Sequence, residues 1–368
     1  MLPTNLPFFL CCTLPQRVGC HYFAARQKDT FSRGQLSSNP GTLLSKQDAH
    51  FSAAQDPAPT LSGPMARRGN PHPQPYRRRA SHAGSWYSEN GVLLGRQLSG
   101  WLGDSASGVV PGPAARAIIA PHAGFSYSAQ TAAAAYAHMD PSKLARVFIL
   151  GPSHHVHIRR CAVSTATCLE TPIGDLTIDQ DVNRQLLDTG HFDVMTSRMD
   201  EDEHSIEMHL PFIRKVMEGR ECKIVAIMVG ALSARLEQQY GRILAPYLED
   251  SANFFIISSD FCHWGSRFRY QPLNAAHGAI HEHISWLDHE GMGLIQSQDA
   301  ARFQQYLEEH ANTICGRHPI AVFLNAIEVS PTRFRVTWVK YAQSSKVISL
   351  EDSSVSYASA IVTQDFCA

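Results

Sequence analysis

Three histidines each follow a short apolar run of the chain, and one cysteine precedes a further apolar run. These residues are His122, His154, His263 and Cys315. Two neutral imidazoles with one anionic ligand let Fe(II) bind a substrate and dioxygen, and a thiolate as the anion also admits copper or zinc. His263 would be either a fourth ligand or a general acid/base oriented by the nearby carboxylate of Asp260. These residue types therefore predict a polar, metal-binding pocket.

Cys315 has the most divergent interpretations. It stands just before a predicted helix and near Arg317, so we expect a lowered thiol pKa and a thiolate available as a ligand or nucleophile. A free cysteine is more often a buried, inert side chain, but the convergent histidines favour the ligand role. Hydrolysis with Cys315 as nucleophile stays open, although no glycine-rich or oxyanion motif accompanies it.

The segment 202–209 (DEHSIEMH) is a further source of site residues. Its histidines lie five apart, so they do not share a helical face as in the zinc-protease motif. His204 and Glu207 lie three apart and can project together, so we expect both to line the pocket. The alternative is a capped helix start with acids in its first turn and Ile206 facing the core.

Strands and helices must alternate to position these residues. Apolar runs predict strands at 115–120, 147–150, 223–229, 254–257 and 333–341. Helices are predicted at 129–138, 180–188, 205–217 with a kink at Pro211, 274–288, 300–310 and 319–327. Apolar strands of this kind suit a parallel sheet buried on both faces. The pattern predicts one α/β domain over residues 79–368, with a central, largely parallel sheet flanked by helices.

The position of the three histidines follows from this architecture. Ligands of open parallel sheets bind beyond the carboxyl ends of the strands. His122, His154 and His263 come after three such ends, so they should converge at one edge of the sheet, provided that the three strands are parallel.

The overall composition excludes several classes of partner. The chain has 368 residues, of which 44% are hydrophobic, and a formal net charge of −1, so we expect no nucleic-acid or anionic-membrane partner. No apolar run reaches the roughly 18 residues of a membrane span. Nine cysteines without a repeating spacing indicate reduced thiols in the cytoplasm or the nucleus rather than a disulfide framework.

Residues 1–78 differ from the rest and predict a disordered extension. The stretch 30–64 is rich in Ser, Pro, Gln, Gly and Ala, a composition that cannot bury a core. The basic residues before Asp29 would also suit an organelle presequence, and a true start at Met65 is a further alternative. The basic run 77–79 is expected to be a solvated edge of the folded domain.

Eight motifs resemble, in the same order, those of the Memo family, mediators of receptor-driven cell motility. They are SHAGSWY (81–87), APHAG (120–124), GPSHH (151–155), DEHSIEMHLP (202–211), SSDFCHWG (258–265), NTICGRHP (312–319), YAQSS (341–345) and DSSVSYA (352–358). The resemblance runs from Ala80 to near the C-terminus. It implies a fold similar to class III extradiol ring-cleaving dioxygenases, which use non-haem iron.

The resemblance also implies roles for the site residues. His122 and His154 match the two metal histidines, Cys315 stands where the dioxygenases have a carboxylate, and His263 matches their acid/base histidine. Memo-family members are associated with phosphotyrosine-bearing receptor peptides, with cell migration and with redox-active iron or copper. The changed third ligand favours a metal-dependent oxidoreductase using Fe(II) or Cu over true ring cleavage.

A second hypothesis is a non-catalytic signalling adaptor. Its pocket would take a phosphorylated receptor peptide or a small-molecule ligand, with Trp86 and Tyr87 as a stacking surface and Arg317 or Arg159 as the phosphate partner. Core packing is the alternative role for the two aromatic residues.

Overall fold

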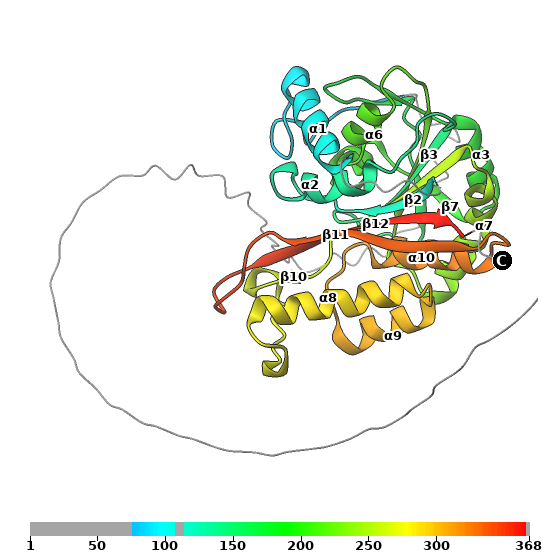
Figure 1. Cartoon of the computed structure of the whole chain (residues 1–368). Coiled ribbons are helices and arrows are strands. Elements are labelled where there is room, and N and C mark those ends of the chain that lie inside the picture. The colour runs from blue at the N-terminus through cyan, green and yellow to red at the C-terminus, as the bar shows by residue number, and fades with distance from the viewer. Residues whose placement is uncertain (1–75, 107–113, 366–368) are drawn as a thin grey trace, which may run out of the picture. The chain divides into compact units, whose positions relative to one another are not determined.

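A mixed β-sheet with helices on both faces forms the core of the protein (Figure 1). The computed structural model describes residues 76–106 and 114–365. The predicted extension over residues 1–78, with its presequence and Met65 alternatives, lies outside the described residues except at 76–78.

Twelve strands make up the sheet within the described residues. They are β1 (Arg77–Arg78), β2 (Ala115–Ala120), β3 (Arg146–Pro152), β4 (Cys161–Val163), β5 (Cys168–Leu169), β6 (Leu176–Ile178), β7 (Phe192–Val194), β8 (Lys223–Val229), β9 (Asn253–Ser258), β10 (His263–Trp264), β11 (Phe334–Gln343) and β12 (Ser354–Gln364). Their order is β1-β5-β6-β8-β3-β9-β2-β12-β10, with β11 beside β12, β4 beside β8 and β7 beside β4. The run β6-β8-β3-β9-β2 is parallel, whereas β12 is antiparallel to β2.

The helices cover both faces of this sheet. They are α1 (Gly91–Ala106), α2 (Phe125–Tyr136), α3 (Gln180–Asp188), α4 (Ser197–Asp202), α5 (His204–Glu207), α6 (Leu210–Val216), α7 (Ala234–Glu249), α8 (Ile280–Gln296), α9 (Ala300–His310) and α10 (Arg317–Val329), with two 3-10 turns, η1 (Ser266–Phe268) and η2 (Ala275–His277). Helices α1, α2 and α6 lie on one side of β2 and β12, and α8, α9 and α10 lie on the other (Figure 1). None of the described helices is long and apolar enough to cross a membrane.

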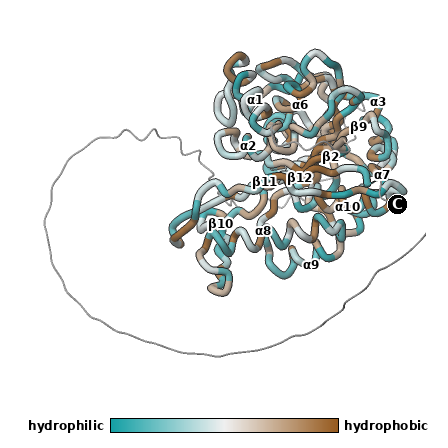
Figure 2. Tube along the Cα trace, in the orientation of Figure 1, coloured by the Kyte–Doolittle hydropathy of each residue, from teal (hydrophilic) through white to brown (hydrophobic). Residues whose placement is uncertain are grey.

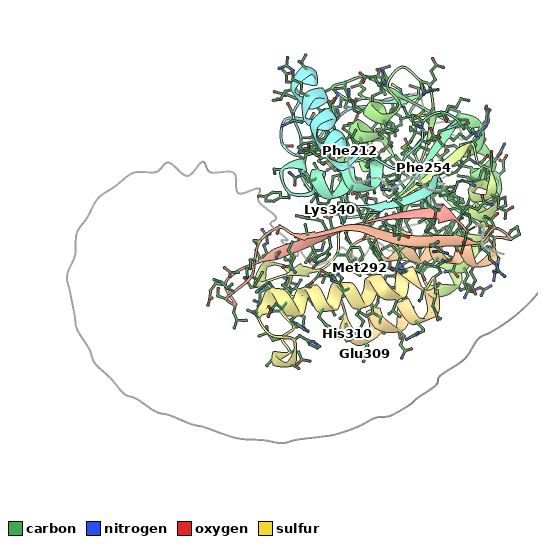
Figure 3. The ribbon with its side chains drawn as sticks, in the orientation of Figure 1. Phe212, Phe254, Met292, Glu309, His310 and Lys340 are labelled. Carbon is green, nitrogen blue, oxygen red and sulfur yellow. The ribbon has the colours of Figure 1, made fainter. Side chains whose placement is uncertain are left out.

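The central strands β2, β3, β8 and β9 are buried on both faces, which gives the domain two hydrophobic clusters. Successive side chains of a strand point to opposite faces, and so Ile118 joins the cluster under α1, α2 and α6 while Ile119 joins the cluster under α7 to α10. Hydropathy along the chain is highest in these central strands (Figure 2). Phe212 and Phe254 belong to the first cluster and Met292 to the second (Figure 3).

Several predicted elements are confirmed and others need correction. Strands β2 and β8 and helices α3 and α9 have the predicted bounds. The predicted helix 205–217 is wrong, because α5 ends at Glu207 and α6 begins at Leu210. Pro211 lies in the first turn of α6, where its missing N–H costs no helical hydrogen bond. The sheet also contains antiparallel pairs, at β5-β6, at β4-β8 and around β12, and β12, α1 and α7 were not anticipated.

Arg78 also corrects the predicted solvated basic run. Its side chain is 0% exposed and forms ion pairs with Asp200 and Glu207. Arg77, by contrast, is 56% exposed and pairs with Glu170 and Asp175 at the surface. The charge run therefore contains one buried member, which ties β1 to the segment that holds α4 and α5.

Candidate metal centre

The three strand ends that carry histidines meet at one edge of the sheet. Strand β9 is the parallel neighbour of both β2 and β3, with Ala120 beside Ser258 and Leu150 beside Ile257. The loops after these strands therefore leave the sheet together. The ring centroids of His122 and His154 are 5.2 Å apart. The predicted convergence of the histidine loops is confirmed for these two residues, and His263 lies near enough to influence both electrostatically.

His122 has its two ring nitrogens in different environments. Nδ1 lies 2.6 Å from Oγ of Ser258, and that hydroxyl donates its only proton to the carbonyl oxygen of Ser205. Ser258 must therefore accept from Nδ1–H, which leaves Nε2 of the neutral ring with a free lone pair. Nε2 lies 3.2 Å from Sγ of Cys315. Burial lowers the pKa of His122 well below its usual value, so the ring is neutral near pH 7.

His154 is oriented by a carboxylate that the sequence analysis did not single out. Glu203 accepts from the backbone N–H of His154 at 2.6 Å and from Nδ1 at 2.9 Å. Burial acts to raise the pKa of Glu203, but the hydrogen bonds that it accepts from the ring and backbone of His154 act in the opposite direction, and the pKa is lowered to about 2. An ionised carboxylate can only accept, so Nδ1 carries a proton, and in the neutral form of the ring the lone pair is on Nε2. This is the carboxylate–histidine arrangement common behind metal ligands.

Cys315 lies between these histidines and the loop after β9. Its Sγ accepts a hydrogen bond from the backbone N–H of Asp260 at 3.2 Å. The predicted lowering of its pKa is wrong: desolvation of the sulfur raises the pKa well above its usual value, and the charge of Arg317 opposes this only weakly. Coordination by a cation would reverse the direction, because a coordinating thiol is deprotonated.

Asp260 and His263 are not paired in the way we expected. The carboxylate of Asp260 accepts from the backbone N–H of His122 at 2.8 Å, and burial raises its pKa to about 7. His263 is held instead by Thr313, whose Oγ1 accepts from the His263 backbone N–H at 2.7 Å and whose carbonyl oxygen lies 3.0 Å from Nδ1. Asp260 thus fixes the His122 loop, and Thr313 fixes the ring of His263. Burial lowers the pKa of His263 to about 4.

The segment 202–209 contributes one of its two predicted residues to the site. The ring of His204 stacks on that of His154, with centroids 4.5 Å apart, and lies 4.4 Å from Trp86. Glu207 is fully buried and instead accepts from the hydroxyl of Tyr87 at 2.6 Å. His204 and half-buried Trp86 therefore form a wall beside His154, whereas Glu207 and Tyr87 anchor the segment behind it.

The two arginines proposed as phosphate partners are exposed. Arg317 lies close enough to Cys315 to influence its charge, and its guanidinium donates to the carbonyl of Ile314 at 3.4 Å. Arg159 lies on the loop after His154, beyond His157. Of the two, Arg317 is the one adjacent to the candidate site.

The donor atoms present fit a metal ion. The ligand atoms of His122, His154 and Cys315 all lie within 4.8 Å of one another. Two ligands of one ion are roughly 3–4 Å apart when each lies about 2.0–2.3 Å from it, and the 3.2 Å between Nε2 of His122 and Sγ of Cys315 agrees with this. Two neutral imidazoles and one sulfur form a set that suits iron, copper or zinc. His154, Glu203 and His204 form a second candidate group, which shares His154 with the first.

Known proteins provide an independent comparison. The family model described as Memo-like protein matches residues 78–361. The chain is 52% identical over 286 residues to Protein MEMO1 of Danio rerio, and the match covers 76% of this chain and 95% of that relative. It is 49% identical over 291 residues to Protein MEMO1 of Homo sapiens, and this match covers 78% of this chain and 97% of that relative. It is 47% identical over 295 residues to Protein memo-1 homolog of Caenorhabditis elegans, and this match covers 77% of this chain and 82% of that relative.

Similar chains also occur among solved structures. One of them is the crystal structure of uncharacterized protein JW3007 from Escherichia coli K12, with 14% identity and a TM-score of 0.34 over 66% of this chain and 98% of that chain. At that score the likeness carries no argument about fold or function.

Proposed function

This chain belongs to the Memo family, as its motifs predicted, and on that basis we propose that it is a metal-dependent redox protein in which His122, His154 and Cys315 hold iron or copper. One observation carries the proposal. Ser258 and Glu203 engage Nδ1 of the two histidines, so the nitrogens left for a cation are both Nε2 atoms. A third donor, Sγ of Cys315, lies within 4.8 Å of the histidine ligand atoms.

The other residues have supporting roles in this proposal. A bound iron or copper ion would supply one-electron redox chemistry at the site. Nδ1–H of His263 donates to the carbonyl of Thr313, so Nε2 is the atom at which His263 exchanges a proton with a bound substrate. Asp260 holds the backbone of the His122 loop. Since sulfur replaces the third-ligand carboxylate of the ring-cleaving dioxygenases that this family resembles, we do not assign ring cleavage to this chain.

The proposed compartment is the cytoplasm, with the nucleus as a second location. The five cysteines among the described residues are all free thiols, which is typical of proteins in reducing compartments.

Metal analysis of untagged protein tests the proposed ligand set. We expect near-stoichiometric iron or copper in the wild-type protein and a large loss in Cys315→Ala and in His122→Ala. Cys222→Ala is the matched control, because Cys222 is a free thiol beside the first residue of β8, at the opposite end of the strands. Bound metal that stays at the wild-type level in both ligand variants would show that the ligand set is wrong.

A peptide-binding role is the second candidate, and it is favoured by exposed Arg317 next to Cys315 and by half-buried Trp86 beside His204. An arginine can bind a phosphate through two parallel hydrogen bonds. Titration of a phosphotyrosine peptide against its unphosphorylated twin measures this directly. A preference for the phosphorylated peptide that disappears in Arg317→Ala supports the role, and equal affinities of the wild-type protein for both peptides exclude phosphate recognition.

A further inference from the structure

A buried carboxylate outside all the motifs lies behind the candidate site. Asp288 is on α8, on the face of the sheet opposite α1 and α2, and its side chain is 0% exposed. Oδ1 accepts from the backbone N–H of Cys262 at 3.1 Å and from Nδ2 of Asn312 at 3.3 Å. Oδ2 accepts from the hydroxyl of Tyr341 at 2.8 Å. Every one of these partners is a donor, which matches a carboxylate.

Two loops of the site meet at Oδ1 of Asp288. Cys262 immediately precedes His263, and Asn312 immediately precedes Thr313. The loops are also joined directly, because Thr313 holds the ring and backbone of His263. They come from segments 50 residues apart in the chain, so their relative position depends on contacts of this kind. Asp288 adds an anchor on a third, separate element.

The second of these loops carries the sulfur of the candidate site. Cys315 lies three residues after Asn312, and its Sγ accepts from the backbone N–H of Asp260 in the first loop. A shift of either loop would therefore change the distance from Sγ to Nε2 of His122, which is 3.2 Å. Removing the carboxylate would leave the buried N–H of Cys262 and the Asn312 amide without their acceptor on Asp288. Because an unpaired buried donor is costly, we expect both loops to shift in that case.

We propose that Asp288 is a positioning residue that fixes the His263 loop and the Cys315 loop relative to each other, so that the sulfur and the proton-exchanging imidazole keep their places in the site. This inference rests on the proposed function in taking Cys315 as a ligand. Burial raises the pKa of Asp288, and hydrogen bonds from Ser356, Tyr341 and Asn312 oppose that effect. Asp288 acts through the two loops and does not touch the candidate ligands itself.

The test compares Asp288→Ala with two matched variants of the full chain. Asp288→Asn keeps an oxygen for Cys262 and Asn312, and its amide can donate to the hydroxyl of Tyr341. Asp179→Ala removes another buried carboxylate, 1% exposed, which accepts from Arg146 and from two backbone N–H groups at the start of α3. Arg146 is the first residue of β3, so Asp179 lies at the far end of the strands from the site.

Two measurements are made on each variant. Amide hydrogen exchange of residues 260–264 and 312–316 in metal-free protein reports the loops without any cation. Cobalt(II) titration, followed by thiolate-to-cobalt absorption, reports the sulfur. We expect Asp288→Ala to speed exchange in both segments and to weaken cobalt binding about 10- to 100-fold. Asp288→Asn should keep both properties, and Asp179→Ala should lower stability with both unchanged.

The outcomes separate this inference from the proposed function. Wild-type exchange in both segments of Asp288→Ala overturns the positioning role, and so does an equal change in Asp179→Ala. If Cys315→Ala binds cobalt as the wild-type protein does, the ligand set is wrong, while the exchange data still decide the role of Asp288. Should Asp288→Ala not fold, Asn312→Ala removes one of the two loop contacts, and faster exchange confined to 312–316 and its neighbours is then the expected result.

Discussion

At the scale of single residues, the tautomers of two histidines determine what the site can bind. Nδ1 of His122 donates to Ser258 and Nδ1 of His154 donates to Glu203. A histidine whose Nδ1 proton is engaged presents Nε2 as a ligand, and an ionised partner also makes that nitrogen more basic. Glu203 is such a partner, since its pKa is lowered to about 2. The carboxylate therefore orients His154 and determines which of its nitrogens is left for a ligand.

Glu203→Gln is expected to weaken metal binding about 10- to 100-fold, because a neutral amide supports the Nδ1 proton of His154 less well than a carboxylate does. Competition with a chromophoric chelator measures the affinity. Asp202→Asn is the control, since Asp202 is the next residue back and pairs with Arg198 at the surface. Equal affinities of Glu203→Gln and wild-type protein would contradict the role of Glu203.

Sequence alone identified the histidines of the site but not their partners. His122 and His154 follow apolar strands, and this local pattern placed them at one sheet edge. Glu203 is 49 residues from His154, and no local pattern records which distant acid a histidine meets. The pKa of Cys315 was predicted in the wrong direction because a helix start and a nearby arginine are visible in sequence, whereas burial of the sulfur depends on the complete fold.

At the scale of elements, the segment 78–87, which precedes α1, is bound tightly to α4 and α5. Arg78 donates to Glu207 at 2.7 Å and to the carbonyl of Glu203 at 2.8 Å. Glu207 also accepts from the backbone and ring of His82 at 2.9 and 2.8 Å. The segment that carries Trp86 is thereby fixed over His204, and the backbone of Glu203 is held behind His154. One buried cluster thus supports both the wall formed by Trp86 and His204 and the backbone of Glu203 behind His154.

Arg78→Met is expected to lower the free energy of unfolding by about 3–5 kcal/mol, because it leaves two buried carboxylates without their cation. Arg77→Met changes the net charge equally but removes only pairs at the surface, where a loss of about 0–1 kcal/mol is expected. Urea unfolding of both variants gives the two values. Similar losses in both variants would refute the distinction between the buried and the exposed arginine.

The same scale shows which elements a sequence can predict. Strand β8 is a continuous apolar run and helix α9 has apolar residues at helical spacing, and the bounds of both were predicted correctly. The break between α5 and α6 was missed because the apolar pattern continues through it. The antiparallel place of β12 beside β2 depends on pairing between residues about as far apart as the domain allows, such as Ile119 and Ala360, and strand pairing partners are not encoded in local periodicity.

At the scale of the whole molecule, the domain keeps several histidines neutral in its interior. Burial lowers the pKa of His209 to about 3 and that of His263 to about 4. His209 is 1% exposed, its Nδ1 lies 2.8 Å from the hydroxyl of Tyr136, and its Nε2 has no hydrogen-bond partner among the described residues. A proton on such a ring would be a buried charge without a counter-ion. The fold therefore resists protonation at these positions.

This resistance makes stability depend on mildly acidic pH, and His209 provides the test. Well above pH 6.5, the ordinary histidine value, its ring is neutral in both the folded and the unfolded chain, so it contributes no pH dependence there. Between pH 6.5 and about 3 the unfolded chain binds a proton that the folded chain does not, so the free energy of unfolding falls as the pH falls. At pH 5 the loss from this residue is about 2 kcal/mol.

In His209→Asn, which keeps an acceptor for Tyr136, urea unfolding of metal-free protein should show a decline from pH 7 to pH 5 that is smaller by about this amount. An undiminished decline in His209→Asn would mean that His209 already carries a proton in the folded protein.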